Sequence, residues 1–327
     1  MRIRQKILRI AAVLIVAAFA AQMARAQNTR PPADYDPNFN YDCDRACLNG
    51  LVDQYLAALV AHDPSPLSLA RDVKYTENGQ LLKIGDGFWG TASAVSAYKI
   101  YADDPQNGQV LFIGLMQENG APVIFCVRLK IELHRITEIE NVIARKEAGS
   151  IARPENLTQP NPIFAQALAP AERRSRANMI AIADSYFNAI EKGHASYVPF
   201  DKDCNRIESG IQTTNNPPQN SQEGSTSVLG LGCADQIKTR NFQPDTLIRD
   251  RRFLVVDEER GLVFASTFFD HDATLRSYTL ADGRTVKQTR TGPWTWEIAE
   301  LFKIQNGKIM RIEALVNTAP YGMKSGW

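Results

Sequence analysis

Residues 294–316 read WTWEIAELFKIQNGKIMRIEALV, and this stretch decides the fold class. Two strand-like runs, 294–304 and 309–316, flank the tetrapeptide Gln305-Asn306-Gly307-Lys308. Asn-Gly between two such runs is a strong signal for the tight turn of a β-hairpin. We therefore expect two long antiparallel strands here, within a sheet that is built from hairpins.

A helical pattern precedes strand-like runs twice along the chain. Apolar residues recur at helical spacing from Leu48 to Val60 and again from Met179 to Ile190. Strand-like runs follow the first helix at 110–116, 122–131 and 137–144, and the second at 253–257, 262–269 and 277–280, before the hairpin. A helix followed by hairpin-linked strands predicts an α+β fold, in which the helix packs on one face of a curved antiparallel sheet.

The two halves of the chain also resemble each other in sequence. Residues 73–79, VKYTENG, align with residues 204–210, CNRIESG, at the offset that also relates Tyr55 to Tyr186. Later matches follow in the same order at larger offsets, because the second copy carries insertions. We interpret this pattern as an internal duplication; the alternative is chance similarity between two α+β segments.

These patterns divide the chain into two domains, 43–144 and 172–327, joined by a linker, 145–171, that is rich in Pro and Ala. A chain of 327 residues is long enough for two such domains. Residues 211–227, IQTTNNPPQNSQEGSTS, form a long polar insertion in the second domain, and a lid is a common use of such loops.

Residues 1–26 are typical of a secretory signal peptide. They combine a basic start, an apolar run at 10–21 and the cleavage pattern Ala24-Arg25-Ala26, and residues 27–42 predict an exposed arm. The apolar run is too short to span a bilayer, which takes about 20 residues; an uncleaved anchor is the alternative. We expect an exported protein, periplasmic or secreted, that leaves the membrane after cleavage.

Cleavage would remove five cations and change the net charge from +1 to about −4. A protein of that charge lacks the basic surface of a nucleic-acid-binding protein.

Export permits disulfides, and the chain contains five cysteines. Cys126 lies in an apolar run and predicts a buried thiol. The other four allow three pairings, among which the sequence does not choose. We nevertheless predict a Cys204–Cys233 disulfide, which would close the polar stretch between them, whereas Cys43 and Cys47, one helical turn apart, would pair with each other or elsewhere. Their spacing matches no zinc motif, so we expect no metal site.

Several motifs resemble those of one superfamily. Residues 75–80 (YTENGQ), 85–89 (GDGFW), 300–313 (ELFKIQNGKIMRIE) and 321–327 (YGMKSGW) are similar to exported tandem members of the nuclear transport factor 2-like superfamily, which includes the SnoaL-like proteins. The resemblance covers both predicted domains. It implies two cone-shaped sheets, each around a pocket, that pack as an internal pseudo-dimer. Members include cofactor-free isomerases, cyclases, hydratases and lyases, and also binding modules.

The sequence contains no serine-triad, P-loop or dinucleotide motif, which leaves acid–base chemistry in an apolar pocket. Glu77 and Glu208 each end an early strand before a Gly, where a catalytic carboxylate and a turn residue are the alternatives. His271 is flanked by acids and is a candidate base, or part of a solvated loop. Arg206 would stabilise negative charge on a substrate oxygen. We expect the second copy, which holds three of these four residues, to be the catalytic one.

Four further residues are candidates for ligand contacts. Tyr75 of the first copy occupies the position equivalent to Arg206 of the second. Trp89 follows an irregular Gly-rich segment, and its side chain would gate a pocket. Trp296 belongs to an aromatic stripe of one strand, although such stripes are more often core. Asp270 precedes His271 at the end of a strand.

The sequence thus predicts an exported small-molecule enzyme that needs no cofactor: a lyase, dehydratase or isomerase acting on a neutral or aromatic substrate. The alternative is a non-catalytic ligand-binding or protein-interaction module. An enzyme's pocket should hold a buried carboxyl or His without a structural partner, whereas a pocket of mutually satisfied polar groups favours a binding module. A further homo-oligomer is left open.

Overall fold

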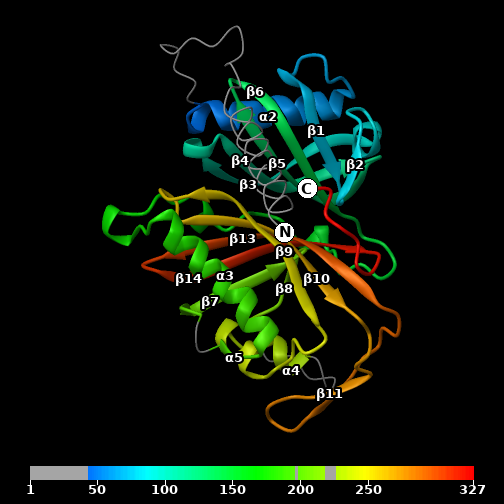
Figure 1. Cartoon of the computed structure of the whole chain (residues 1–327), viewed down its shortest axis with the longest axis vertical. Coiled ribbons are helices and arrows are strands. Elements are labelled where there is room, and N and C mark those ends of the chain that lie inside the picture. Colours follow the sequence, from blue (N-terminus) through cyan, green and yellow to red (C-terminus); the bar gives the residue numbers. More distant parts are fainter. Residues whose placement is uncertain (1–42, 196–197, 218–225) are drawn as a thin grey trace, which may run out of the picture. The chain divides into compact units, whose positions relative to one another are not determined.

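The computed structural model describes residues 43–195, 198–217 and 226–327, which form one compact unit (Figure 1). The predicted signal peptide, 1–26, and the predicted arm, 27–42, lie outside these residues, as does part of the predicted insertion 211–227. Within the described ranges, no helix is long and apolar enough to cross a membrane.

The first half of the described chain consists of one long helix and one six-stranded sheet. Helix α2 covers Arg45–Ala61, and the strands are β1 (Leu69–Glu77), β2 (Gln80–Leu82), β3 (Ala92–Asp104), β4 (Gln109–Glu118), β5 (Ala121–Glu132) and β6 (Arg135–Ala144). They lie in the order β2-β1-β6-β5-β4-β3. Strands β1 and β6 are parallel, and the other neighbours are antiparallel.

The second half repeats this arrangement. Its elements are α3 (Arg176–Lys192), β7 (Phe200–Glu208), β8 (Ile211–Gln212), α4 (Thr226–Leu229), α5 (Cys233–Lys238), β9 (Leu247–Asp257), β10 (Leu262–His271), β13 (Trp294–Gln305) and β14 (Lys308–Ala319), with a separate small sheet of β11 (Ser277–Thr279) and β12 (Thr285–Lys287). The strand order β8-β7-β14-β13-β10-β9 is that of the first sheet, with β7 and β14 parallel. The predicted hairpin is confirmed, because Gln305 pairs with Lys308 where β13 turns into β14.

Capping residues set the ends of both long helices. The Asp44 side chain accepts a hydrogen bond from the Cys47 amide at the start of α2, and the Ser175 side chain accepts one from the Asn178 amide at the start of α3. At the other end of α3, Gly193 adopts a left-handed conformation that suits glycine. These caps explain why each helix begins and ends close to its predicted position.

Each sheet packs on both of its faces, because side chains alternate along a strand. One face of the first sheet packs against α2, and one face of the second packs against α3 (Figure 1). The opposite faces share a third core, to which Ile113 and Cys126 of the first sheet and Phe264 and Leu301 of the second contribute. The architecture is α+β, with two six-stranded sheets that share one strand order.

Two disulfides cross-link the chain. One joins Cys43 to Cys47 at the start of α2, and the other joins Cys204 of β7 to Cys233 of α5. Cys126 is a free, buried thiol. Such cross-links form and persist in oxidising compartments, so they fit an exported protein.

Candidate functional site

A cavity of about 250 Å³ lies in the second half, between the helix-facing side of the sheet and α3 and α5. Its walls are largely aromatic, and most of its polar side chains are charged or titratable. The aromatic lining residues are Tyr186, Phe242, Phe269, Tyr278, Trp294 and Trp296, and the polar ones include Arg206, Glu208, Gln236, Asp245, His271 and Glu300. The predicted residues Arg206, Glu208, His271 and Trp296 thus come together at one cavity.

Strand pairing sets two carboxyl groups at one level of this cavity. Glu208 of β7 pairs with Ala314 of β14, and Ala314 pairs with Glu300 of β13. Neighbouring strands lie roughly 5 Å apart, so the backbones of the two glutamates are about 10 Å apart across the sheet. The methyl side chain of Ala314 lies between them. The small Ala314 leaves room for a ligand between the carboxyl groups.

Glu300 is the buried acid of the site. Its side chain is only 2 % exposed, and its Oε2 atom has no hydrogen-bond partner among the described residues. Burial raises the pKa of this carboxyl to about 8, and the negative charge of Glu208 adds to the shift, while the Arg206 charge and a hydrogen bond with Tyr186 oppose it. With a pKa of about 8, the Glu300 carboxyl is mostly protonated at pH 7.

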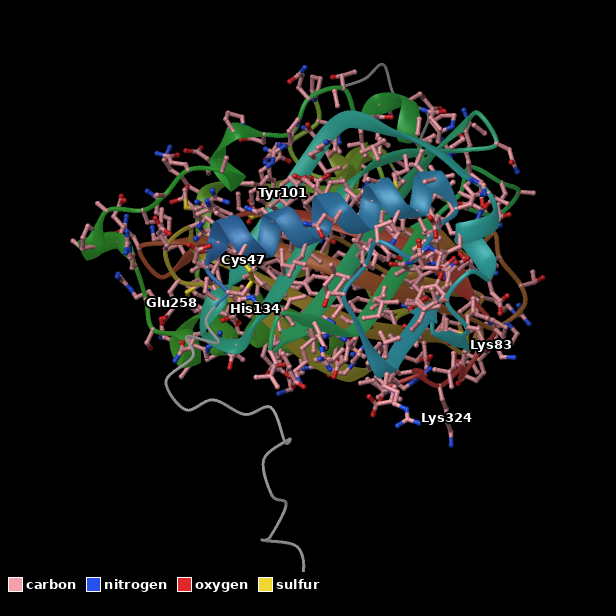
Figure 2. All side chains as sticks on the ribbon, turned by 90° about the horizontal axis from the view of Figure 1, so that it is seen from above. Cys47, Lys83, Tyr101, His134, Glu258 and Lys324 are labelled. Carbon is pink, nitrogen blue, oxygen red and sulfur yellow. A yellow bond between two sulfur atoms is a disulfide. The ribbon has the colours of Figure 1, made fainter. Side chains whose placement is uncertain are left out.

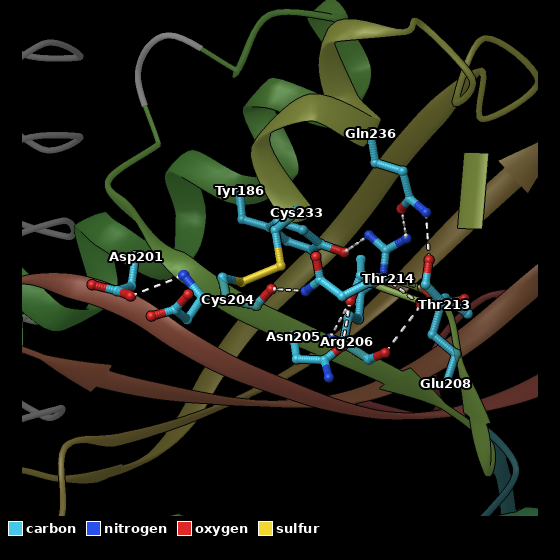
Figure 3. The surroundings of a disulfide bond; sticks show 12 residues. Tyr186, Asp201, Cys204, Asn205, Arg206, Glu208, Thr213, Thr214, Cys233 and Gln236 are labelled. Atoms are coloured by element: carbon cyan, nitrogen blue, oxygen red, sulfur yellow. Dashed lines mark hydrogen bonds and ion pairs between the residues drawn. A yellow bond between two sulfur atoms is a disulfide. The ribbon is translucent and has the colours of Figure 1, made fainter. Parts of the chain in front are cut away.

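Glu208 has a different environment, which Figure 3 shows. Its side chain is 24 % exposed, and its Oε1 atom lies 2.9 Å from Nε of Arg206. The two carboxyl groups of the cavity thus differ: one is buried without a full set of partners, and the other is paired with a cation. Enzymes that use a general acid and a general base place two carboxyl groups in contrasting environments of this kind.

The Arg206 guanidinium is held entirely by the protein. Nε donates to Thr213 Oγ1 over 2.9 Å, Nη1 donates to the Tyr186 hydroxyl over 3.0 Å, and Nη2 donates to Gln236 Oε1 (Figure 3). Gln236 lies on α5, one turn after Cys233, and the Cys204–Cys233 disulfide joins this helix to the strand of Arg206. The disulfide therefore supports the network that orients Glu208.

His271 lies at the other end of the cavity and also has a partner on each nitrogen. Nδ1 is 3.1 Å from the Phe269 carbonyl oxygen, which only accepts, and Nε2 is 2.6 Å from Asp245 Oδ1. The imidazole stacks on Trp294, with 4.2 Å between the ring centroids, and meets Trp296 edge to face. The Trp294 indole nitrogen Nε1 is buried without an acceptor among the described residues.

Asp270 does not line the cavity. Because side chains alternate along β10, it points away from the side to which His271 points. Its carboxylate accepts hydrogen bonds from Arg249 Nε at 2.7 Å and from Thr295 Oγ1 at 2.5 Å. Asp270 therefore has a structural environment, and its predicted ligand contact gains no support.

The candidates of the first half lie in a filled core. Tyr75 and Trp89 are about 1 % exposed, and Trp89 packs edge to face on Tyr55. The Glu77 carboxylate accepts hydrogen bonds from the Phe88 amide at 2.7 Å and the Tyr75 hydroxyl at 3.1 Å, and lies 3.6 Å from Arg145. This environment matches the alternative of a residue that shapes the bend.

The sequence analysis missed three residues of the site. Glu300 stood within an aromatic stripe that is typical of core, although a carboxyl group in such a stripe is itself a signal. Asp245 and Gln236 lie on a loop and a short helix beyond the polar insertion, and no motif marks them. Among the described residues, the one group of three close potential metal ligands is Cys43, Cys47 and His134, outside this cavity.

Comparison with known protein families finds a match to part of the chain. Residues 172–316 match the family described as Domain of unknown function (DUF8021), and this match includes the cavity residues named above. No curated protein matches the chain.

Similar solved structures include three proteins of different origin. A de novo designed protein with a curved β-sheet is 15 % identical, with 44 % of this chain and 88 % of the other covered and a TM-score of 0.27. A protein of unknown function with a cystatin-like fold from Methylobium petroleophilum is 12 % identical, with 34 % and 85 % of the two chains covered and a TM-score of 0.28. An epoxide hydrolase/cyclase-like enzyme of pyran ring formation in salinomycin is 10 % identical, with 45 % and 98 % of the two chains covered and a TM-score of 0.29. These low scores carry no argument about function, which must come from the cavity itself.

Proposed function

We propose that the protein is a cofactor-free acid–base enzyme, acting in the cavity of its second half on a small, neutral or aromatic compound. The observation that carries the proposal is Glu300: a buried, protonated carboxyl with one unpartnered oxygen at the wall of an aromatic cavity. Burying such a group is costly, and perturbed carboxyl groups of this kind cluster at catalytic sites.

Glu208 and Glu300 divide the chemistry between them. The Glu208 carboxylate removes a proton from a substrate carbon beside a carbonyl group, and Glu300 gives its proton to the carbonyl oxygen, which yields an enol. In a β,γ-unsaturated substrate this enol is a dienol, and delivery of the Glu208 proton to its γ-carbon, with return of the oxygen proton to Glu300, moves the double bond into conjugation and completes an isomerisation. If Glu300 instead protonates a departing hydroxyl group, the same pair carries out a dehydration.

Arg206, His271 and Asp245 then support these two groups. Arg206 uses its hydrogen bonds on the protein, so it contributes its charge and the position of Glu208. His271 is engaged on both nitrogens and orients the indoles of Trp294 and Trp296, which would stack on an aromatic ligand.

A ligand-binding module without turnover is the second candidate. The six aromatic side chains that line the cavity would also suit a protein that binds a ligand without converting it. Two polar atoms at the cavity, Glu300 Oε2 and Trp294 Nε1, lack partners, however, and a cavity whose polar groups were mutually satisfied would favour the binding module. We therefore favour the enzyme.

Deuterium exchange tests the proposal without knowledge of the natural substrate. Phenylacetone, a small benzyl ketone, is incubated with the protein in D₂O, and NMR follows loss of the benzylic C–H signal. We expect exchange above the buffer rate, and a loss of about 10²–10⁴-fold in Glu300→Gln, since that is the usual contribution of a positioned acid or base. Binding of the ketone without catalysed exchange would favour the binding module.

We further propose that the protein is exported and that its halves are two copies of one cone-shaped domain, packed as an internal pseudo-dimer. The two disulfides support export, and the shared strand order and the common core between the sheets support duplication. The intact mass of the exported protein tests the first point, because cleavage after Ala26 removes residues 1–26.

A further inference from the structure

Two sulfur atoms and an imidazole meet at the start of α2, far from the cavity. Cys43 and Cys47 form a disulfide there, and Sγ of Cys47 lies 3.9 Å from Nδ1 of His134, which belongs to the turn between β5 and β6 (Figure 2). The ligand atoms of the three residues all lie within 4.8 Å of one another. The fold thus brings together three potential metal ligands from two distant segments.

The spacing suits a tetrahedral ion once the disulfide is open. With zinc–sulfur bonds of about 2.3 Å and zinc–nitrogen bonds of about 2.0 Å, tetrahedral geometry puts sulfur and nitrogen about 3.6 Å apart and two sulfurs about 3.8 Å apart. The observed sulfur–nitrogen distance of 3.9 Å is close to the first value. The Cα atoms of Cys43 and Cys47 are 5.2 Å apart, so rotation of the side chains can separate the sulfurs without moving the backbone.

The local electrostatics favour thiolates at this place. Cys47 lies in the first turn of α2, and its amide is one of the donors at the helix N-terminus. The helix dipole stabilises negative charge at this end of α2. Cys47 is half-buried, so a reductant can reach the disulfide, whereas Cys204 and Cys233 are both buried.

We propose that Cys43, Cys47 and His134 form a zinc site that is closed by oxidation and opened by reduction. A phosphine opens the disulfide: it supplies two electrons and becomes a phosphine oxide, and one water molecule supplies the oxygen and the two protons of the new thiols. Zinc then displaces these protons to solvent and binds both thiolates and the imidazole nitrogen. Water completes four ligands, as in zinc sites with three protein ligands.

Cobalt is the probe for this site, because a tetrahedral thiolate–cobalt complex absorbs strongly. The full chain is reduced with a phosphine under argon and titrated with Co²⁺, and zinc is then added to displace the cobalt. We expect one equivalent of Co²⁺ to give thiolate charge-transfer and tetrahedral d–d bands, which zinc abolishes. The oxidised protein should give neither band, and this comparison needs no variant.

Two matched pairs of variants assign the ligands. Cys43→Ser should abolish the bands, whereas Cys204→Ser, which removes one thiol of the other disulfide, should keep them. His134→Ala should weaken Co²⁺ binding at least about tenfold, since even outer-sphere partners of metal ligands have effects of that size; His194→Ala, at the end of α3, should not. Equal spectra for reduced and oxidised protein, or unchanged affinity in His134→Ala, would overturn the proposal. Neither readout depends on turnover in the cavity.

Discussion

The two halves share a strand order, but the space between sheet and helix is filled by side chains in the first half and contains a cavity in the second. In the first sheet, the row that begins at Glu77 continues through Asn141, Val127 and Phe112. In the second sheet, the equivalent row begins at Glu208 and continues through Ala314, Glu300 and Ala265. In the second row, alanine stands in the places of Asn141 and Phe112, and a glutamate stands in the place of Val127.

These differences decide which half is open. Asn141 donates a hydrogen bond to the Tyr55 hydroxyl, and Phe112 packs against Phe125, so side chains fill the first row. In the second half, the small Ala314 separates Glu208 from Glu300, and both glutamates line the cavity. One strand order therefore accommodates a filled core in one half and a cavity lined by two carboxyl groups in the other, depending on a few side chains of one face.

We expect the largest effect from a substitution at one position of the sheet, which we compare between the two halves. Glu208→Gln should lower the rate of ketone exchange by about 10²–10⁴-fold, because it removes the proposed base. Glu77→Gln, at the equivalent position, should keep the wild-type rate, because Glu77 accepts hydrogen bonds within a filled core. NMR exchange rates in D₂O measure both variants, with circular dichroism as the control for folding. The reverse pattern would place the chemistry in the first half.

The next prediction tests how completely the first half is filled. Phe112→Ala should destabilise the protein by about 3–5 kcal/mol, because it removes a fully buried ring and leaves a cavity. Urea denaturation gives this value. The cavity should also take up a small aromatic ligand such as benzene, as engineered apolar cavities do. A loss below about 1 kcal/mol would mean that the first core collapses around the gap.

The disulfides should differ in their contribution to stability. Cys204–Cys233 closes a sequence separation of 29 residues and Cys43–Cys47 one of 4. In the chain-entropy model these loops correspond to about 3.6 and about 2 kcal/mol. Urea denaturation of Cys204→Ser/Cys233→Ser and Cys43→Ser/Cys47→Ser should therefore show a larger loss for the first double variant. Equal losses would indicate that the native contacts near each disulfide, and not loop length, set its effect.

The fold could be predicted well where local signals agree. Asn306-Gly307 between two strand-like runs marked the β13–β14 hairpin, and apolar residues at helical spacing marked both long helices. Strand β3 could not be predicted in the same way, because its alternation is broken by two register shifts against β4. Such a strand depends on tertiary contacts more than on its own pattern.

The site was only partly predictable, for a similar reason. Arg206, Glu208 and Trp296 lie on strands, where side chains alternate between the two faces of the sheet. Their positions along β7 and β13 therefore place all three on the face that lines the cavity. The same alternation separates Asp270 from His271 and could have excluded Asp270. Gln236 comes from a segment whose position depends on the Cys204–Cys233 disulfide, and strand periodicity says nothing about it.

The last prediction concerns pH and contrasts one acid from each half. The pKa of Glu300 is raised by burial, so between about pH 4.5 and 8 the folded chain holds a proton that the unfolded chain has released. Stability must then fall as pH rises through this window, by up to about 1.4 kcal/mol per pH unit for this group. Glu300→Gln lacks this loss, so its stability relative to wild type should increase with pH.

Glu118 of the first half should show the opposite sign. Its hydrogen bond with Arg145 lowers the pKa of its carboxyl, so its contribution is present above the unfolded pKa and is lost as pH falls. Urea denaturation of wild type, Glu300→Gln and Glu118→Gln from about pH 2.5 to 8 measures both differences, because the Glu118 contribution is lost below about pH 4.5. The other buried acids, Glu297 and Glu313, are present in all three proteins, so their contributions cancel where the sites do not interact. If the Glu300→Gln difference were flat with pH, Glu300 would be ionised in the folded protein, and its assignment as the proton donor of an open second half would fail.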